Sequence, residues 1–368
     1  MEDFEFYTPT KVIFGKNAEL QIGREIASRG YKKVLVHFGG TYLCETGEID
    51  KIHRSLEDAG LSYVDLGGVV PNPRLSLAKE GVDLCKKEGV DFILGVGGGS
   101  AIDSSKAIAY GLVNDFPLED LFLGKEKTDK IAPIGCITTI AATGSETSNS
   151  TVVTIETQDQ GILKRSYNHD CARPLFAAMN PELTYTLPKY QIGCGIADIM
   201  MHTLERYFIP DQKNRMTDEI AEGLLRTVID SGRMAMKRSD DYDAMSELMW
   251  CGSLSHNNLT GLGREKDFSV HKLGHALSAR FDCAHGATLA SVWGAWAWYV
   301  WERDIARFAH YAKQVWGIER DEISAAKEGI ERTIAYFEEI GMPTSISGLG
   351  IGVLEDETLK ELALDATM

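Results

Sequence analysis

The stretch FILGVGGGSAIDSSK, residues 92–106, decides the fold of this 368-residue chain. It begins as a short apolar run, typical of a buried strand, and changes to a helical pattern directly after Ser100. Glycines at this turn, Gly97 to Gly99, let backbone amides approach a ligand, and the helix N-terminus adds partial positive charge. Both features suit a pyrophosphate, although the GxGxxG spacing of the common dinucleotide fingerprint is missing. A plain tight turn, with Ser100 as N-cap and Asp103 in the first helical turn, explains the same residues without a ligand.

The sequence on both sides of this turn alternates short apolar runs with helical patterns. Further strands are predicted at residues 11–14, 33–38, 61–66, 131–139 and 174–180, with helices near 18–29, 49–59 and 75–87. The runs 151–156 and 162–166 predict a hairpin around the turn QDQG. Short strands separated by helices are typical of βαβ units, so we expect a parallel sheet covered on both faces.

After Pro188 the pattern becomes helical throughout, which predicts two domains. We expect an α/β dinucleotide-binding domain at residues 1–188 and an all-helical metal and substrate domain at residues 189–368. The stretch SVWGAWAWYVWERD, residues 291–304, holds four of the six tryptophans and predicts a deeply buried helix.

The charge balance limits the partners of this protein. A formal net charge of −16 disfavours nucleic acid and anionic membranes, because both would be repelled over most of the surface. There is no run of eighteen apolar residues, and the N-terminus MEDFEFYTPT is acidic rather than a basic leader. We therefore expect a cytoplasmic protein that acts on small molecules.

Two segments of the helical half carry candidate metal ligands. In GCGIADIMMHTLERYF, residues 193–208, Asp198 and His202 are four apart and share one helix face. The segment SVHKLGHALSARFDCAH, residues 269–285, adds the imidazoles of His271, His275 and His285. A carboxylate with imidazoles is typical of an open catalytic site for Fe²⁺, Zn²⁺, Mn²⁺ or Co²⁺.

The spacing does not decide which of these side chains bind metal. A lone buried histidine is more often a hydrogen-bonded core residue than a ligand. Four ligands are the usual number, so one of the three histidines in the second segment is expected to do something else.

A polar run follows the predicted strand at residues 131–139. It extends from Thr138 to Thr147 and would lie beside the glycine turn, where open α/β sheets bind ligands. Hydroxyls that cap the next element are the alternative explanation. Lys164, in the predicted hairpin, gains a role only if a cofactor binds there.

Five motifs in order resemble the iron-containing (group III) alcohol dehydrogenases, and within that family the NADPH-dependent butanol dehydrogenase and aldehyde reductase branch. They are GGGSAIDSSK at 97–106, TTIAATGSETS at 138–148, NPELTYTLP at 180–188, DIMMH at 198–202 and HKLGHALSARFDCAH at 271–285. The resemblance covers nearly the whole chain. It implies the two-domain plan above and hydride transfer between NADP(H) and a primary alcohol or aldehyde.

The resemblance also assigns roles to residues. It implies that the metal ligands are Asp198, His202, His271 and His285, that the metal is iron or zinc, with manganese or cobalt as further options, and that His275 lies beside the nicotinamide and substrate. The catalytic group would then be His275, Asp198 and His271. The cofactor residues implied are Gly39, Gly40, Thr41, Asn72, Gly97, Gly98, Gly99, Ser100, Asp103, Thr138, Thr139, Thr147 and Lys164.

The cofactor preference rests on the turn after the second predicted strand. Relatives that prefer NAD place an aspartate there, which bonds the ribose 2′-hydroxyl and repels a 2′-phosphate. This chain has Gly39, Gly40 and Thr41 instead, so we expect NADP(H) to be preferred over NAD(H). The branch usually has GGGS where this chain has GGTY, so Tyr42 is expected to crowd the phosphate. The chain is also expected to lack a last helix that relatives tend to have.

Two other functions compete with this prediction. A cyclising lyase of the dehydroquinate synthase type has the same two-domain plan with NAD and metal, but it needs several basic residues around its substrate. The metal segments supply chiefly Arg206, Lys272 and Arg280. A non-catalytic dinucleotide-binding protein would leave Asp198 and the histidines unexplained. We expect a homodimer, the commonest oligomer of such chains.

Overall fold

A computed structural model describes residues 1–157, 161–210 and 214–367. Contacts divide the chain into an α/β unit, Tyr7–Ile140 with Gly144–Tyr185, and a helical unit, Met1–Phe6 with Ala141–Thr143 and Thr186–Met368. A short piece of the first half, Ala141–Thr143, thus packs with the helices. The expected division into continuous domains at residues 188 and 189 stays a prediction.

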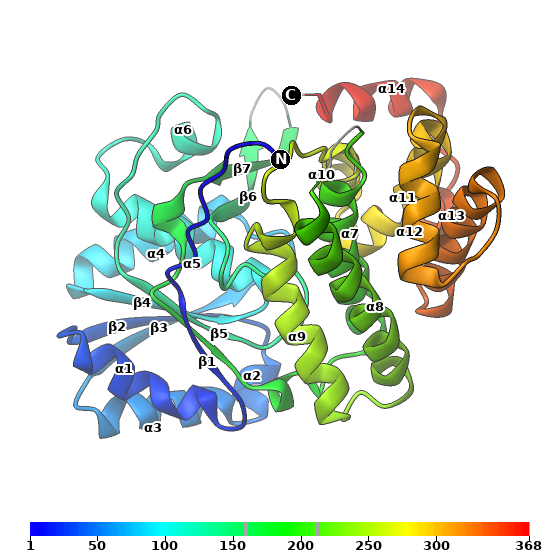
Figure 1. Cartoon of the computed structure of the whole chain (residues 1–368). Coiled ribbons are helices and arrows are strands. Elements are labelled where there is room, and N and C mark those ends of the chain that lie inside the picture. The colour runs from blue at the N-terminus through cyan, green and yellow to red at the C-terminus, as the bar shows by residue number, and fades with distance from the viewer. Residues whose placement is uncertain (158–160, 211–213, 368) are drawn as a thin grey trace. The chain divides into compact units, whose positions relative to one another are not determined.

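The α/β unit is built on a six-stranded sheet in the order β1-β8-β5-β4-β2-β3, and every neighbouring pair is parallel (Figure 1). The strands are β1 (Lys11–Phe14), β2 (Lys33–Gly39), β3 (Ser62–Val69), β4 (Phe92–Gly97), β5 (Ile134–Thr138) and β8 (Phe176–Met179). The predicted fold class, a parallel-sheet domain followed by a helical domain, is confirmed.

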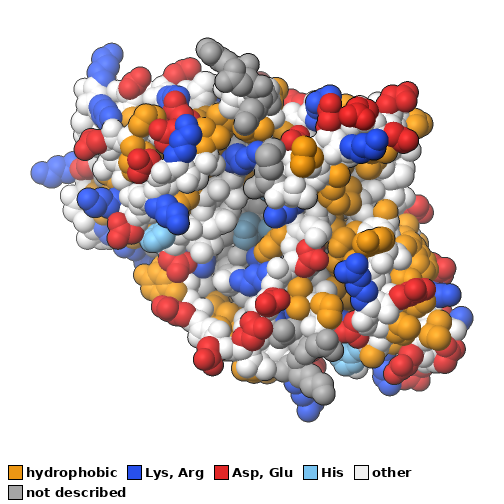
Figure 2. All heavy atoms as spheres, turned by 90° about the horizontal axis from the view of Figure 1, so that it is seen from above, with side chains coloured by type: hydrophobic (Ala, Val, Ile, Leu, Met, Phe, Trp, Pro, Cys, Tyr) orange, Lys and Arg blue, Asp and Glu red, His pale blue; other side chains and the backbone are white. Residues whose placement is uncertain are grey.

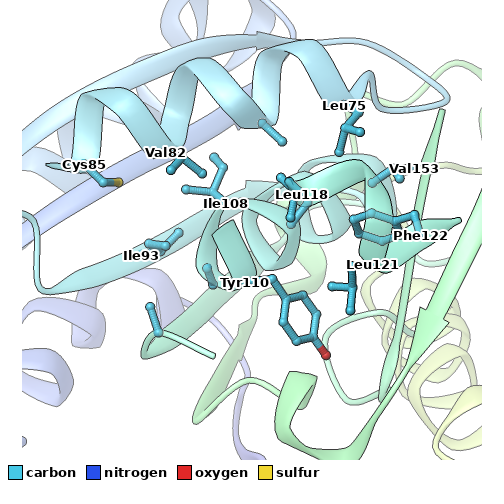
Figure 3. Close-up of a cluster of buried hydrophobic side chains, with 14 of the residues drawn as sticks. Leu75, Val82, Cys85, Ile93, Ile108, Tyr110, Leu118, Leu121, Phe122 and Val153 are labelled. Carbon is cyan, nitrogen blue, oxygen red and sulfur yellow. The ribbon is translucent and has the colours of Figure 1, made fainter. Parts of the chain in front are cut away.

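Helices cover both faces of this sheet because successive side chains of each strand point to opposite sides. Val34 and Val36 of β2 pack with the cluster under α1 and α3, whereas Leu35 packs with the cluster under α4 and α5. Figure 3 shows the second cluster, in which Ile108 and Leu118 meet Val82. The helices are α1 (Ile22–Ser28), α2 (Tyr42–Glu45), α3 (Glu48–Asp58), α4 (Leu75–Glu88), α5 (Gly99–Val113) and α6 (Leu118–Phe122), with the 3-10 helices η1 (Ala18–Gln21), η2 (Asp170–Ala172) and η3 (Pro181–Thr184).

The predicted hairpin is present as β6 (Ser150–Thr157) and β7 (Gly161–Asn168), which pair antiparallel. Residues 158–160 of its turn QDQG lie outside the described residues. The hairpin is fixed to the loop before α4, because the Thr154 amide donates to the Pro73 carbonyl at 2.8 Å.

The helical unit contains α7 (Lys189–Tyr207), α8 (Arg215–Lys237), α9 (Tyr242–His256), α10 (Ser269–Phe281), α11 (His285–Val300), α12 (Ile305–Trp316), α13 (Glu322–Glu339) and α14 (Asp356–Asp365), with η4 (Leu259–Gly261), η5 (Trp301–Arg303) and η6 (Ser347–Leu349). Among the described residues, no helix has the length and apolar character needed to cross a membrane.

The tryptophan-rich helix α11 is less deeply buried than its composition predicts. Trp293, Trp296 and Trp301 are buried, but Trp298 is 38% exposed and Tyr299 is 75% exposed. The expectation of a deeply buried helix therefore holds for residues 286–297 with the exception of Ala295, and is wrong for the C-terminal end of α11. The C-terminal turns of α11 keep one face in solvent.

The molecular surface shown in Figure 2 carries acidic and basic side chains that are interspersed. No broad patch of one sign is visible on that face among the described residues.

Candidate metal centre and nucleotide-binding turn

Helix α7 provides the first two candidate ligands. It begins after Pro188, which cannot donate a backbone hydrogen bond, and its apolar residues are buried on all sides. Asp198 and His202 lie one turn apart, and His202 Nε2 is 3.4 Å from Asp198 Oδ1. Their side chains are buried, so a helix face that is otherwise apolar carries a carboxylate and an imidazole.

Helices α10 and α11 bring further imidazoles to the same place, since both pack against α7 (Figure 1). Helix α10 ends where Asp282 adopts a φ of 52°, and α11 begins three residues later at His285. His271 Nε2 lies 3.7 Å from Asp198 Oδ1 and 3.3 Å from His202 Nε2. His285 Nε2 lies 3.8 Å from the same carboxylate oxygen.

Three of these side chains, Asp198, His202 and His271, fit one divalent metal ion, and His285 lies close enough to Asp198 to be a fourth candidate. Bonds of about 2.0–2.2 Å to a four-coordinate ion place ligand atoms roughly 3.3–3.6 Å apart, close to the separations found here. Asp198, His202 and His271 form the compact group, since their ligand atoms all lie within 4.8 Å of one another. Within the described chain, buried Asp198 Oδ1 has no hydrogen-bond partner, and burying such a charge is costly without a cation.

His275 lies at the edge of this group. Its ring centroid is 4.9 Å from that of His285 and 6.2 Å from that of His271. It is half-buried, one helical turn beyond His271. The structure therefore brings all five residues of the sequence-based metal hypothesis together.

Glu205 is a further residue of this site, which sequence reasoning missed. One carboxylate oxygen accepts hydrogen bonds from the Val270 and His271 amides at 2.7 and 3.2 Å, and the other pairs with His271 Nδ1. Burial alone would lower the pKa of His271, but the Glu205 and Asp198 carboxylates outweigh it and raise that pKa to about 9. Since Nδ1 is held by Glu205, Nε2 faces Asp198.

Arg206 and His256 flank His202. The Arg206 guanidinium donates to the His202 carbonyl and lies over the Phe268 ring, 4.9 Å from its centroid. The His256 ring stacks on the His202 ring with centroids 4.0 Å apart. Burial first, and then neighbouring His256, His271 and Arg206, hold the pKa of His202 well below its usual value. A neutral imidazole is the form that binds a metal.

The glycine turn of the α/β unit differs from the sequence prediction in one detail. Helix α5 begins at Gly99 with Gly98 as its N-cap, so Ser100 lies inside the first turn and the prediction of Ser100 as N-cap is wrong. Gly97 has a φ of 144°, which only glycine adopts readily. A Cβ at Gly98 would lie 2.7 Å from Ile140 Cδ1, so the Ile140 side chain would have to shift to admit it.

Three of the predicted cofactor positions lie in a row at the carboxyl edge of the sheet. Gly97 pairs with Thr138 of β5, and Gly39 ends β2 on the other side of β4. Among the described residues, the buried Thr138 hydroxyl has no hydrogen-bond partner. A buried hydroxyl without a partner at this edge of the sheet is available to hydrogen-bond a bound ligand.

Tyr42 lies across the glycine pair that follows β2. Its ring is so close to Gly40 that a Cβ there would be 2.7 Å from Tyr42 Cδ1, and its hydroxyl is 2.8 Å from Thr139 Oγ1. Gly40 has a φ of 78° and Thr41 is exposed. Tyr42 thus contacts two predicted cofactor residues, Gly40 and Thr139, and the crowding of a 2′-phosphate stays a prediction.

Asp103 and Thr147 are held by neighbouring loops. Ser145 Oγ and the Val152 amide donate to the Asp103 carboxylate at 2.5 and 3.1 Å, and burial raises the pKa of Asp103. The Thr147 carbonyl accepts from Arg173 at 2.6 Å. The Asp103 side chain and the Thr147 backbone thus have structural contacts already, whatever these residues contribute to a ligand.

Asn72 and Lys164 are 92 residues apart in the sequence but form a buried hydrogen bond, with Lys164 Nζ 3.0 Å from Asn72 Oδ1. Asn72 has a φ of 57°, which asparagine tolerates better than most residues. The predicted cofactor residues of the hairpin and of the loop before α4 therefore meet.

Lys106 is a second residue that sequence reasoning missed. Its buried ammonium donates to Ser145 Oγ at 3.0 Å and to the carbonyls of Ser145, Ser148 and Ser150 at 2.8, 3.1 and 2.8 Å. It fixes the polar loop after β5 to helix α5. The available signal was a lysine directly before the largely apolar run AIAYGLV, residues 107–113.

Comparisons with known proteins show the family to which this chain belongs. The profile of the family "Iron-containing alcohol dehydrogenase" matches residues 9–181, and that of "Fe-containing alcohol dehydrogenase family, C-terminal" matches residues 194–368. The chain is 39% identical to NADH-dependent butanol dehydrogenase A of Clostridium acetobutylicum, over 96% of this chain and 90% of the relative. It is 33% identical to NADPH-dependent aldehyde reductase YqhD of Escherichia coli, over 95% of this chain and 90% of the relative.

A solved structure shows the same fold. It is that of NADH-dependent butanol dehydrogenase A from Thermotoga maritima, with a TM-score of 0.95 and 35% identity, covering 100% of this chain and 91% of the other. The chain therefore belongs to the iron-containing alcohol dehydrogenase family and is an oxidoreductase similar to its butanol dehydrogenases and aldehyde reductases.

Proposed function

We propose that this enzyme transfers hydride between NADP(H) and a primary alcohol or its short-chain aldehyde, and that the reaction depends on a divalent metal. The observation that carries the proposal is the convergence of Asp198 Oδ1 with the Nε2 atoms of His202, His271 and His285 at separations that suit one ion. The names of the relatives, butanol dehydrogenases and an aldehyde reductase, support the substrate class.

The metal centre is proposed to hold Fe²⁺, or else Zn²⁺, Mn²⁺ or Co²⁺, since a mixed nitrogen and oxygen set suits all four. A metal bound there supplies Lewis-acid polarisation of an alcohol or carbonyl oxygen. The chain itself keeps the ligands in place: Glu205 orients His271, and burial excludes water from Asp198 and His202.

Reduction of an aldehyde also consumes one proton. His275 is the proposed relay for it, because it is half-buried beside His285 and His271 rather than enclosed with them. An imidazole can pass a proton near neutral pH without large cost.

The nucleotide is proposed to bind at the carboxyl edge of the sheet. Gly97, Gly98, Gly99 and Ser100 would face the diphosphate at the start of α5. Thr138, Thr139, Thr147, Asp103, Asn72 and Lys164 would lie along the rest of the nucleotide, with Gly39, Gly40 and Thr41 at the 2′-phosphate.

The preference for NADP(H) rests on the absence of a carboxylate in the turn Gly39-Gly40-Thr41. The relatives include enzymes named for NADH and one named for NADPH, so the preference needs its own test. We expect a higher kcat/KM with NADPH than with NADH, measured with butanal at one ionic strength. Equal values would contradict the preference but leave the reaction type intact.

The experiment that tests the function is butanal reduction followed at 340 nm, before and after chelation and with metal restored. We expect activity to disappear with chelation and to return with Fe²⁺ or Zn²⁺. His271→Ala should abolish both metal binding and activity while the fold is retained. His310→Ala serves as control, because that histidine is half-exposed and pairs with Glu222. Full activity in chelated His271→Ala protein would remove the metal from the mechanism.

The cyclising-lyase alternative is not favoured. The family is that of iron-containing alcohol dehydrogenases, and the relatives are named as a butanol dehydrogenase and an aldehyde reductase. Of the three basic residues considered for it, Arg206 is engaged with His202 and Phe268, Lys272 is exposed, and Arg280 pairs with Glu361 at the surface. A non-catalytic dinucleotide-binding role is excluded by membership in an enzyme family.

We further propose a homodimer that works in the cytoplasm on small molecules, with no nucleic acid or membrane partner. Light scattering should give twice the chain mass of 40.6 kDa. A mass of one chain at micromolar concentration would contradict the dimer.

A further inference from the structure

The segment Ala141–Thr143 belongs to the helical unit, although the residues on both sides of it belong to the α/β unit. Thr138 and Thr139 precede it and Thr147 follows it, and all three are proposed nucleotide contacts. A bound nucleotide that orders these threonines would therefore also restrict residues 141–143, which pack with the helical unit.

The segment is packed tightly on α7, which carries Asp198 and His202, and on α9, which carries His256. At Gly195 of α7, a Cβ would lie 2.2 Å from the Ala141 carbonyl oxygen, and at Gly252 of α9 it would lie 3.1 Å from the Ala142 carbonyl oxygen. Gly195 is three residues before Asp198, and Gly252 is four residues before His256. Because closely packed interiors transmit strain, a displacement of residues 141–143 displaces the helices that carry these side chains.

The last residue of the segment is connected to a metal ligand through one side chain. The Thr143 carbonyl can only accept, so His256 Nδ1 donates to it. The same His256 ring stacks on the His202 ring with centroids 4.0 Å apart and planes 29° from parallel. His256 therefore touches the nucleotide loop at one end and a candidate ligand at the other.

We propose that His256 is a positioning residue through which nucleotide binding and metal binding are coupled. The inference rests on the proposed function. A bound dinucleotide orders the loop from Thr138 to Thr147, the Thr143 carbonyl then fixes the His256 ring, and His202 is held in the orientation that a metal requires. Binding of the metal favours the loop conformation that the dinucleotide requires, because coupling between two binding sites is reciprocal.

The test measures Co²⁺ affinity by calorimetry, with and without saturating NADPH, and NADPH affinity with and without Co²⁺. We expect each ligand to tighten the other by the same factor, about fivefold or more. The visible absorption bands of bound Co²⁺ should shift when NADPH is added, which reports the ligand geometry directly.

Two variants separate the two contacts of His256. His256→Asn keeps a donor for the Thr143 carbonyl but loses the ring on His202, whereas His256→Phe keeps a ring but loses the donor. Both variants should bind Co²⁺ alone within about threefold of wild type, yet lose the coupling and the spectral shift. His310→Ala, in the same unit, should keep both.

Wild-type protein that binds both ligands independently, or a His256 variant that keeps the full coupling, would overturn the inference while leaving the proposed function standing. Protein that binds neither Co²⁺ nor NADPH would overturn both.

Discussion

Glu205 is the residue whose contacts most strongly constrain the metal centre. Its carboxylate accepts hydrogen bonds from two amides in the first turn of α10 and pairs with His271 Nδ1, so that Nε2 of this histidine points to Asp198. Carboxylates that hold a ligating histidine in this way typically contribute about 10–100-fold to metal affinity. We expect Glu205→Gln to weaken Co²⁺ or Zn²⁺ binding by that factor.

Calorimetric titration of metal-free protein measures this effect. Glu219→Gln is the matched control, since Glu219 is exposed and pairs only loosely with Arg215 at 3.5 Å. If Glu205→Gln and Glu219→Gln bound the metal equally well, Glu205 would have no part in orienting His271.

His37 in β2 sets a pH dependence of stability. Its Nδ1 donates to the Leu66 carbonyl at 2.7 Å and its Nε2 accepts from the Ser104 hydroxyl at 2.8 Å, so the buried ring is neutral. Burial lowers the pKa of His37 to about 4, from 6.5 in the unfolded chain. Between these pH values the unfolded chain binds a proton that the folded chain does not. The stability from His37 is therefore complete above pH 6.5 and is lost as the pH falls toward 4.

The size of this loss follows from the shift, since one pKa unit corresponds to about 1.4 kcal/mol. We expect wild type to lose roughly 3 kcal/mol more unfolding free energy than His37→Gln over that range, measured by urea denaturation. Ser104→Ala keeps the imidazole and should follow the wild-type profile. Parallel profiles for wild type and His37→Gln would show that the ring is not buried as a neutral group.

Sequence reasoning predicted the candidate ligands but not the groups around them. Asp198 and His202 are detectable because their spacing is helical, and Glu205, seven residues after Asp198, was on the same face and could have been included. His256 had no such signal, since its contacts come from Thr143 and from His202 on a different helix. Contacts between distant segments have no local pattern.

The approach of α11 to α7 is the element contact that places His285. A Cβ at Gly286 would lie 2.0 Å from the Cys194 carbonyl oxygen, so the helices touch backbone to backbone. We expect Gly286→Ala to push the start of α11 away, to move His285 off the site and to cost about 1–3 kcal/mol of stability. Metal affinity should fall in parallel.

Gly223→Ala is the control for this change, because Gly223 lies in α8 and a Cβ there meets only the end of Arg226, at 3.9 Å. Replacing a helical glycine without a clash should stabilise the protein by roughly 0.5–1 kcal/mol. Urea denaturation and metal titration of both variants decide the matter. A Gly286→Ala protein with unchanged metal affinity would mean that α11 does not position a ligand.

The elements themselves were largely predictable. The spacing of apolar residues and the glycines at element ends predicted β1, β2, β4 and α4 to within about two residues. These elements were predictable because the pattern lies in their own side chains. The exposed face of α11 was not predictable, because the three tryptophans of this helix do not show which of its sides faces the core.

For the whole molecule, the sequence predicted a parallel sheet followed by helices but not the strand order, in which β1 pairs with β8 at an edge. It also gave no sign that Ala141–Thr143 would pack with the helical unit. Both facts depend on contacts between residues far apart in the chain, and on glycines such as Gly195 that make a close approach possible.

The central claim is that one divalent ion is held by α7, α10 and the start of α11. An anomalous-difference map, recorded at the absorption edge of the loaded metal from a crystal of the enzyme, measures this directly. The account predicts a single peak within about 2.0–2.2 Å of Asp198 Oδ1 and of the Nε2 atoms of His202, His271 and His285. A peak elsewhere, or none in a crystal grown with metal, would contradict it.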